Sequence, residues 1–270
     1  MARKLPNYKQ IRYKQIRYKQ IRHKQLGLAL SEWRHWSLPI ESEPTALKRL
    51  GSGKTNQSYL VRAGDLRLVL RLESANSDYL GIDRNFEQRV IATLGSEFSP
   101  KHVYANSEQS YSVFEYIKGR VWTRDDLESV DQMSVLESVI KRIQKTKIDG
   151  SIFDYLSYLE QYQDHLKRKN ISTALMKLDQ YSLFRLELER FLSESWVPVL
   201  CHHDLVPENI IETADGLKII DWEYAGLGHP DFDRRYACSL LNSNPEQCLR
   251  GDVMDQLIYW LNYYWGLVRG

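Results

Sequence analysis

The chain has 270 residues, of which 43% are hydrophobic and 27% are charged. This balance predicts a folded globular protein and excludes fibrous or disordered classes. Its three cysteines form no C-x-x-C pair and cannot close a full disulfide framework, so we expect a cytoplasmic protein. The longest mainly apolar stretch, 257–268, is too short to cross a bilayer, and no membrane span is expected.

Charge is distributed unevenly along the chain. Nine of the 37 Lys and Arg residues lie in the first 25 residues, where there is no Asp or Glu. The remaining 245 residues therefore carry 28 positive against 35 negative side chains, a net charge of −7. An acidic body argues against nucleic acid as a partner and is compatible with attraction of small cations.

The basic N-terminus is an internal repeat in which YKQIR occurs three times between Tyr8 and Arg22. On a helix each five-residue copy rotates by about 140° relative to the last, so the isoleucines form no stripe. Residues 1–25 are therefore predicted to be a disordered basic tail. An electrostatic arm for nucleic acid or anionic lipid is the alternative.

The elements predicted from Leu26 onward divide the chain into two parts. Residues 26–118 are rich in strands, with a Gly-rich turn and one helix; residues 119–270 are mostly helical, with one strand before a hairpin. The expected strands are 47–50, 58–61, 66–72, 111–116 and 197–201, and the expected helices are 83–94, 127–143, 155–168 and 181–192. The pattern predicts an α+β, bilobal fold, with an N-lobe (26–118) and a C-lobe (119–270) that join at a cleft.

The Gly-rich turn, Gly51-Ser52-Gly53-Lys54-Thr55-Asn56, resembles a Walker A loop only superficially. That motif needs Gly where this chain has Lys48, and a helix must follow it, whereas strands are expected here. A Gly-rich loop between antiparallel strands is typical of kinase-type folds, where its backbone covers nucleotide phosphates. An ordinary hairpin turn is the alternative.

The strongest signal is the pair of segments His202-His203-Asp204-Leu205-Val206-Pro207-Glu208-Asn209 and Ile219-Ile220-Asp221-Trp222-Glu223. A predicted hairpin joins them and folds one back on the other. Phosphoryl transfer needs a carboxylate beside the attacking hydroxyl and oxygen ligands for Mg²⁺, and H-x-D-x-x-x-x-N with a later Asp supplies both. The alternative is that the aspartates cap turns and His202 is structural.

At these residues the sequence resembles the aminoglycoside phosphotransferase and choline kinase superfamily, relatives of the protein kinases. The segment LKIIDWEYAGLG (217–228) looks most like bacterial choline and thiamine kinases. The resemblance implies a protein-kinase-like fold with a nucleotide-binding N-lobe, a catalytic and acceptor-binding C-lobe and the active site in the cleft between them. It also implies ATP and Mg²⁺ as cofactors. It implies catalytic roles for Asp204, the base, and His202, and metal binding by Asn209 and Asp221.

The same resemblance implies a nucleotide site made mainly by the N-lobe. The residues it assigns to ATP are Gly51, Ser52, Gly53, Asn56, Arg71, Glu87, Glu115 and Tyr116. Arg71 takes the place where protein kinases have Lys and is expected to pair with Glu87, while Glu115 and Tyr116 belong to the hinge that binds adenine. A surface ion pair without a role is the alternative for Arg71 and Glu87. Asp233 is expected to fix the catalytic loop.

The acceptor is expected to be a small cationic alcohol, because no A-P-E segment follows Asp221 and aromatic residues are abundant nearby. Its predicted contacts are Trp222, Glu223, Tyr224 and Tyr236, together with aromatic residues of 259–265, which could equally be helix core. The resulting prediction is an ATP-dependent kinase of choline or thiamine. An aminoglycoside or other small-molecule kinase is one alternative, and a pseudokinase-like binding or regulatory protein is another.

Overall fold

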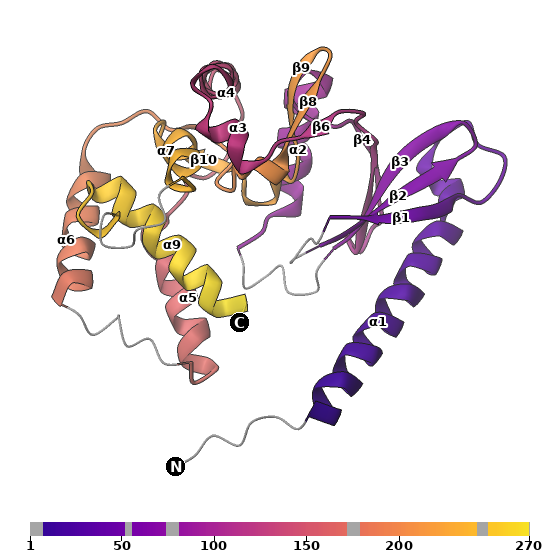
Figure 1. The fold of residues 1–270 in the computed structure, drawn as a ribbon, viewed down its shortest axis with the longest axis horizontal. Helices are drawn as coiled ribbons and strands as arrows, with labels where there is room; N and C mark the ends of the chain where they lie inside the picture. The colour runs from indigo at the N-terminus through magenta and orange to yellow at the C-terminus, as the bar shows by residue number, and fades with distance from the viewer. Residues whose placement is uncertain (1–7, 52–55, 74–80, 172–178, 242–247, 270) are drawn as a thin grey trace. The chain divides into compact units, whose positions relative to one another are not determined.

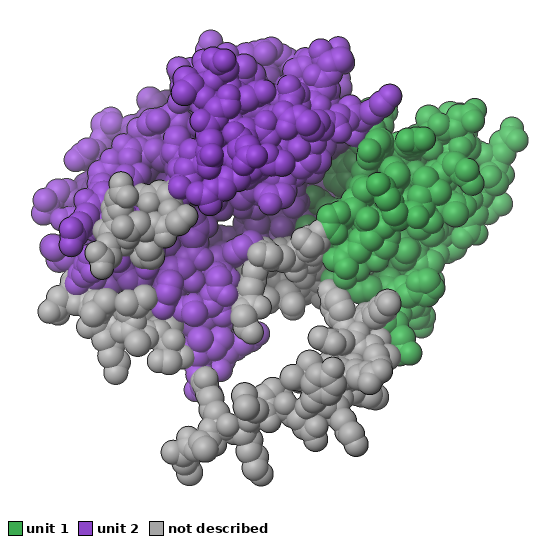
Figure 2. Space-filling view, viewed as in Figure 1, with its two compact units in different colours: residues 1–75, 101–116 green, residues 76–100, 117–270 purple. Residues whose placement is uncertain are grey.

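The computed structural model describes residues 8–51, 56–73, 81–171, 179–241 and 248–269 (Figure 1). The chain divides into two compact units: residues 1–75 with 101–116, and residues 76–100 with 117–270 (Figure 2). The segment 76–100, which was predicted as part of the N-lobe, therefore belongs to the second unit. Among the described helices, none has the length and apolar character that crossing a bilayer requires.

The first unit is built on a five-stranded antiparallel sheet in the order β1-β2-β3-β5-β4. Leu68, Leu70 and Leu72 alternate along β3 and are buried, as the period of two predicts. They pack with Trp33 and Trp36 of the short helix η1 in one hydrophobic cluster. The strands are β1 (Thr45–Leu50), β2 (Gln57–Ala63), β3 (Leu66–Leu72), β4 (His102–Ala105) and β5 (Tyr111–Glu115), and η1 spans Trp33–Trp36.

Helix α1 (Tyr8–Ser31) includes all three YKQIR copies, which differs from the predicted disorder. The repeat has no Gly or Pro and consists of residues with acceptable helix propensity. The helix is anchored near its C-terminal end, where Leu26, Ala29 and Leu30 join the core of the sheet and Arg22 donates to the Glu73 carbonyl over 3.0 Å. The missing apolar stripe does not exclude a helix here, because a helix fixed at one end needs no apolar stripe along its whole length.

The second unit is mostly helical, and its core lies among α5, α6, α7 and α9. Its helices are α2 (Arg84–Phe98), α3 (Arg124–Glu128), α4 (Val130–Ile143), α5 (Tyr155–Arg168), α6 (Asp179–Ser193), α7 (Phe232–Ser239) and α9 (Val253–Arg269), with short helices η4 (Pro207–Asn209) and η5 (Trp222–Tyr224). The helix predicted over 127–143 is two helices, because the Ser129 side chain caps α4 by accepting from the Gln132 N–H.

Two small sheets carry the motif segments of the second unit. Strand β7 (Val199–Cys201) pairs with β10 (Gly226–Gly228), so the chain just before His202 lies beside the chain just after Ala225. The predicted hairpin is β8 (Ile210–Thr213) with β9 (Gly216–Ile219), and β6 (Arg120–Val121) pairs with β8. The two motifs are thus brought together by β-pairing on both sides.

Candidate active site

The catalytic segment, which we define as His202–Asp204, is held by the backbone. The buried carboxylate of Asp233 accepts from the N–H groups of His202 and His203 over 2.7 and 3.0 Å. Burial raises the pKa of Asp233, and the nearby His202 and these two donors act against that shift. The expectation that Asp233 fixes the catalytic loop is confirmed.

His203 is the internal support of this segment. It has φ 63°, an uncommon conformation for a residue with a side chain. Its Nδ1 lies 3.1 Å from the Tyr224 carbonyl, and its Nε2 lies 3.0 Å from the Tyr155 hydroxyl. Burial lowers the pKa of His203 to about 3, so the ring is neutral, with Nδ1–H donating to the carbonyl and Nε2 accepting.

Gly228 makes this close packing possible. A Cβ at Gly228 would lie 2.5 Å from both His203 Nε2 and the Tyr155 hydroxyl. The glycine is needed here for close approach of side chains to the backbone.

His202 connects the two motifs. Its ring is buried against Trp222; Nδ1 accepts from the Asp204 N–H over 3.2 Å, and Nε2 donates to the Ile220 carbonyl over 2.9 Å. Both nitrogens are therefore engaged by backbone groups. This geometry holds the ring between the two motifs, and the predicted catalytic role of His202 stays a prediction.

Asn209 and Asp221 flank the base of the β8–β9 hairpin, where Asn209 lies opposite Ile220 and Asp221 follows directly. The Ile220 N–H donates to the Asn209 carbonyl over 2.9 Å, and Asn209 Nδ2 donates to the Asp204 carbonyl over 2.9 Å. Because the amide nitrogen is used in this way, Asn209 has its side-chain oxygen as a ligand atom. Asp221 has φ 64° and ψ 58°, the left-handed conformation that Asp tolerates better than most residues.

These two side chains fit the predicted Mg²⁺ site. Among the described residues, no group of three or more His, Cys, Asp or Glu is arranged to hold a metal ion. Mg²⁺ in nucleotide-dependent enzymes commonly takes one or two protein oxygens, with substrate phosphates and water completing its shell. One carboxylate and one amide oxygen at the hairpin base match that donor set.

Glu87 and Glu223 are joined by a buried arginine that sequence reasoning did not single out. Arg84 Nη1 lies 2.8 Å from Glu87 Oε2, and Arg84 Nη2 lies 3.0 Å from Glu223 Oε2. All three side chains are at most 7% exposed. The bridge ties α2 to the turn two residues after Asp221. The predicted pairing of Glu87 with Arg71 would join the two units and stays a prediction.

The predicted nucleotide residues of the first unit lie on its strands and in the connections beside them. Arg71, near the end of β3, is buried, pairs with Glu73 over 2.9 Å and lies over the Phe114 ring. The remaining ones are Gly51 with φ 58°, buried Asn56 before β2, exposed Glu115 at the end of β5 and Tyr116 just after it. Ser52 and Gly53 lie outside the described residues. Their roles in binding ATP stay predictions.

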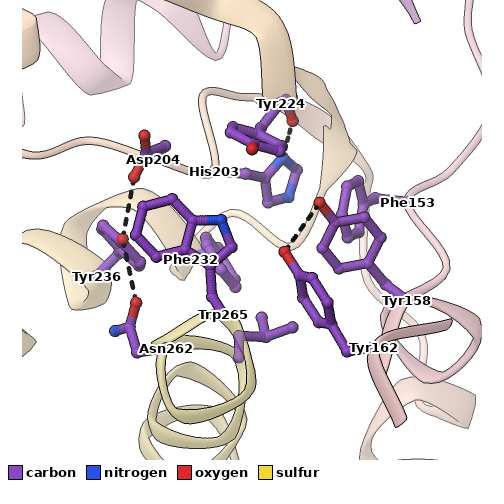
Figure 3. Close-up of a pocket in the computed structure, with 11 residues that line it drawn as sticks. Phe153, Tyr158, Tyr162, His203, Asp204, Tyr224, Phe232, Tyr236, Asn262 and Trp265 are labelled. Carbon is purple, nitrogen blue, oxygen red and sulfur yellow. Dashed lines mark hydrogen bonds between the residues drawn. The ribbon is translucent and has the colours of Figure 1, made fainter. Parts of the chain in front are cut away.

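A pocket beside Asp204, with about 440 Å³ of empty volume, lies within the second unit. Figure 3 shows Asp204, Tyr236 and Asn262 on one side of it and Tyr158 and Tyr162 on the other. Its walls are aromatic, and Asp204 is the only carboxylate among the described residues that line it. The lining residues are Phe153, Tyr158, Tyr162, His203, Asp204, Tyr224, Phe232, Tyr236, Leu261, Asn262 and Trp265.

Half of the predicted acceptor set lines this pocket. Tyr224 and Tyr236 do, whereas Trp222 and Glu223 do not. The Trp222 indole is buried and donates to the Ile219 carbonyl over 2.9 Å, and Glu223 is paired with Arg84. Backbone geometry explains the difference, because successive residues of the turn η5 point in different directions and only Tyr224 faces the pocket.

Sequence reasoning missed the wall formed by Phe153, Tyr158 and Tyr162. A signal was present, because Tyr158 and Tyr162 are four residues apart and so share one face of α5. Within 259–265, Trp260 and Tyr264 are core, as the alternative interpretation expected, whereas Trp265 lines the pocket.

The fold and this site define a protein-kinase-like phosphotransferase. The sequence from 46 to 261 matches the phosphotransferase enzyme family, and the chain belongs to that family. The family resemblance drawn from the two motifs is confirmed.

Relatives and solved structures agree on this fold. Protein LicA of Haemophilus influenzae is 27% identical over 191 residues, covering 67% of this chain and 54% of LicA, so the chain spans about half of that relative. Mouse ethanolamine kinase 2 is 22% identical and aligns with 87% of this chain and 63% of its own length. The structure resembles choline kinase LicA from Streptococcus pneumoniae at 21% identity, with a TM-score of 0.63 and coverage of 91% and 90% of the two chains. A streptomycin–ATP complex of the aminoglycoside phosphotransferase APH(2")-IIa has a TM-score of 0.53 at 20% identity, covering 76% and 73%.

Proposed function

We propose that the protein transfers the γ-phosphate of ATP to the hydroxyl of a small cationic alcohol, with choline as the preferred acceptor. The observation that carries this proposal is the position of Asp204 in the wall of a pocket whose other described walls are mostly aromatic. A quaternary ammonium offers no hydrogen-bond donor at its charge, so aromatic faces are the groups that attract it.

The charge of the pocket favours an acceptor with a single cation. Asp204 supplies one negative charge, and His203 is neutral because burial lowers its pKa to about 3. An aminoglycoside carries several ammonium groups and would require several carboxylates. The relatives named LicA and ethanolamine kinase support choline over thiamine.

In the proposed reaction, Asp204 accepts a hydrogen bond from the acceptor hydroxyl and takes its proton as the oxygen attacks the γ-phosphorus. The bond from the γ-phosphorus to the β–γ bridging oxygen breaks, and ADP leaves with that oxygen. Asn209 and Asp221 would hold Mg²⁺, which neutralises charge on the phosphates when it is bound. Arg71, with Glu87, and the loop 51–56 would hold the phosphates, and the hinge at Glu115 and Tyr116 would hold adenine. His202 and Asp233 keep the catalytic segment in place. The similarity of this fold to a crystal structure of LicA in complex with AMP supports ATP as the donor.

The test is phosphorylation of a panel of alcohols by the purified chain with ATP and Mg²⁺. The panel contains choline, thiamine, ethanolamine, kanamycin and 3,3-dimethylbutanol, the neutral carbon analogue of choline. We expect the highest kcat/KM for choline and a much higher KM for its neutral analogue, because only the cation is attracted by ring faces. Preference for kanamycin, or equal KM for choline and the neutral analogue, would contradict the proposed acceptor class.

A further inference from the structure

The carboxylate of Asp204 is contacted by a chain of two polar side chains from different helices. The hydroxyl of Tyr236 on α7 lies 3.1 Å from Asp204 Oδ1 and 3.2 Å from Oδ1 of Asn262 on α9 (Figure 3). Tyr236 is buried, and Asn262 is exposed at the pocket. Tyr236 was expected to be an aromatic acceptor contact, and its hydroxyl suggests a different role.

Helix α7 supports the whole catalytic segment from one face. Asp233 and Tyr236 are three residues apart and so lie on the same side of the helix. Asp233 binds the backbone of His202 and His203, and Tyr236 binds the side chain of Asp204. Helix α7 thus fixes the backbone of His202 and His203 and also the carboxylate of Asp204, the residue that follows them.

The direction of the hydrogen bonds between Asp204, Tyr236 and Asn262 follows from the chemistry of a phenol. Tyr236 has one proton to donate and an oxygen that also accepts. With Asn262 Oδ1 toward the phenol, as the structure has it, the single proton of Tyr236 faces two acceptors; a half-turn of the Asn262 amide would bring its NH₂ group to the phenol oxygen and leave that proton to Asp204. Arg235 keeps α7 beside α9 at this point through ion pairs with Asp252 over 2.6 Å and Asp255 over 3.0 Å.

We propose that Tyr236, supported by Asn262, is a positioning residue that fixes the Asp204 carboxylate in the orientation required for phosphoryl transfer. The inference rests on the proposed function, in which Asp204 meets the acceptor hydroxyl. A carboxylate that turns freely spends only part of its time within reach of that hydroxyl, and displacements of about 1 Å lower catalytic rates strongly.

The kinetic test uses Tyr236→Phe, which removes the hydroxyl and keeps the ring parallel to Phe232. We expect kcat to fall about tenfold, which corresponds to about 1.4 kcal/mol, with an unchanged KM for ATP. In an Asp204→Asn background the same substitution should have no further effect, because Tyr236 acts through that carboxylate. Asn262→Leu should lower kcat less, and the double variant Tyr236→Phe/Asn262→Leu should match Tyr236→Phe.

Tyr259→Phe on α9 is the matched control, since this tyrosine does not line the pocket; it should leave kcat unchanged. An unchanged kcat for Tyr236→Phe would overturn the proposal. An equal loss in the Asp204→Asn background would also overturn it, because Tyr236 would then act independently of Asp204.

A measurement without substrate separates this inference from the acceptor assignment. Side-chain rotamer populations of Asp204 are obtained by NMR from three-bond carbon couplings in the complete chain. We expect one dominant rotamer in the wild type and mixed rotamers in Tyr236→Phe. Identical populations would overturn the positioning role, whereas failure of the whole alcohol panel would contradict the proposed function alone.

Discussion

The catalytic segment and the aromatic wall of the pocket are built by different kinds of interaction. Directional hydrogen bonds fix the catalytic segment: His202 and His203 bond to the Asp233 carboxylate and to the Ile220 and Tyr224 carbonyls, and Asp204 accepts from Tyr236. The opposite wall consists of rings that touch one another, such as Phe153 with Tyr158 at 4.9 Å and Tyr158 with Tyr162 at 5.0 Å between centroids. The chemistry of phosphates requires defined residue types, whereas attraction of a cation requires only aromatic faces.

The largest loss of activity is expected from a substitution at the base of the β8–β9 hairpin. Asp221→Ala is expected to abolish turnover at saturating Mg²⁺ and to leave the chain folded, because its charge is required by the metal and not by the hydrophobic core. The measurement is kcat together with the thermal unfolding midpoint. Asp215→Ala, at the exposed tip of the same hairpin, is the control and should keep wild-type kcat. Near wild-type turnover of Asp221→Ala would remove this residue from the metal site.

The next largest effect is expected from a substitution of Asp204, the proposed catalytic base. Asp204→Asn should lower kcat by about 10²- to 10⁴-fold and leave ATP affinity nearly unchanged, because the amide keeps the shape but loses the charge. Single-turnover phosphorylation and calorimetric ATP binding measure the two quantities. Glu208→Gln, an exposed carboxylate in the same motif, serves as the control. A parallel loss of ATP binding would make Asp204 a structural residue of the loop.

The same contrast explains which parts could be predicted from the sequence. Asp204, Asn209 and Asp221 stand at fixed spacings within two short segments joined by a hairpin. In the structure Asn209 and Asp221 flank that hairpin and Asn209 donates to the Asp204 carbonyl, while their catalytic and metal-binding roles stay predictions. The pocket wall comes from residues near 153–162, 224–236 and 261–265, whose meeting depends on how α5, α7 and α9 pack. No local pattern distinguishes Trp265, which faces the pocket, from Trp260, which is core.

Two further features were not predicted, because they too depend on tertiary packing. The bridge from Arg84 to Glu223 connects residues 139 positions apart, and long-range ion pairs leave no signature in spacing. Helix α1 was not predicted because the residues that anchor it to the core of the sheet, Leu26, Ala29 and Leu30, lie outside the repeat. Prediction therefore succeeded where chemistry restricts residue type and failed where tertiary packing decides.

The aromatic wall should affect binding more than chemistry. Trp265→Leu is expected to raise the KM for choline about 30-fold, corresponding to about 2 kcal/mol for a desolvated cation–π contact, with little change in kcat. Steady-state kinetics with choline and with 3,3-dimethylbutanol measure the effect, and Trp265→Phe, which retains a ring, should lose less. If kcat fell as much as KM rose, the wall would take part in the chemical step and the contrast would fail.

The contribution of His203 to folding stability should depend on pH. Its folded pKa of about 3 lies below the ordinary value of 6.5, so the unfolded chain binds the proton first as pH falls. This stabilisation is fully present above pH 6.5 and is lost between pH 6.5 and about 3. The stability difference between wild type and His203→Asn, a variant that tolerates the left-handed conformation, should shrink by about 1.4 kcal/mol per pH unit in that window. Urea unfolding of both at pH 7.5 and 5.5 tests this, and a pH-independent difference would mean that folding leaves the pKa of His203 unchanged.

The smallest effects are expected from α1, which belongs to neither region. Removing residues 1–19 should leave kcat and stability nearly unchanged, because this part of the repeat offers no continuous apolar face. Removing residues 1–25 also deletes Arg22, whose guanidinium is buried and donates to the Glu73 carbonyl over 3.0 Å. A hydrogen bond of this kind is worth about 1 kcal/mol, so the longer truncation should lower Tm by about 2–4 °C while kcat stays constant. Arg22→Ala in the full chain should reproduce that shift in Tm. A loss of kcat in the shorter truncation would show that the repeat contributes to catalysis and that the contrast between the catalytic segment and the pocket wall omits a third functional part.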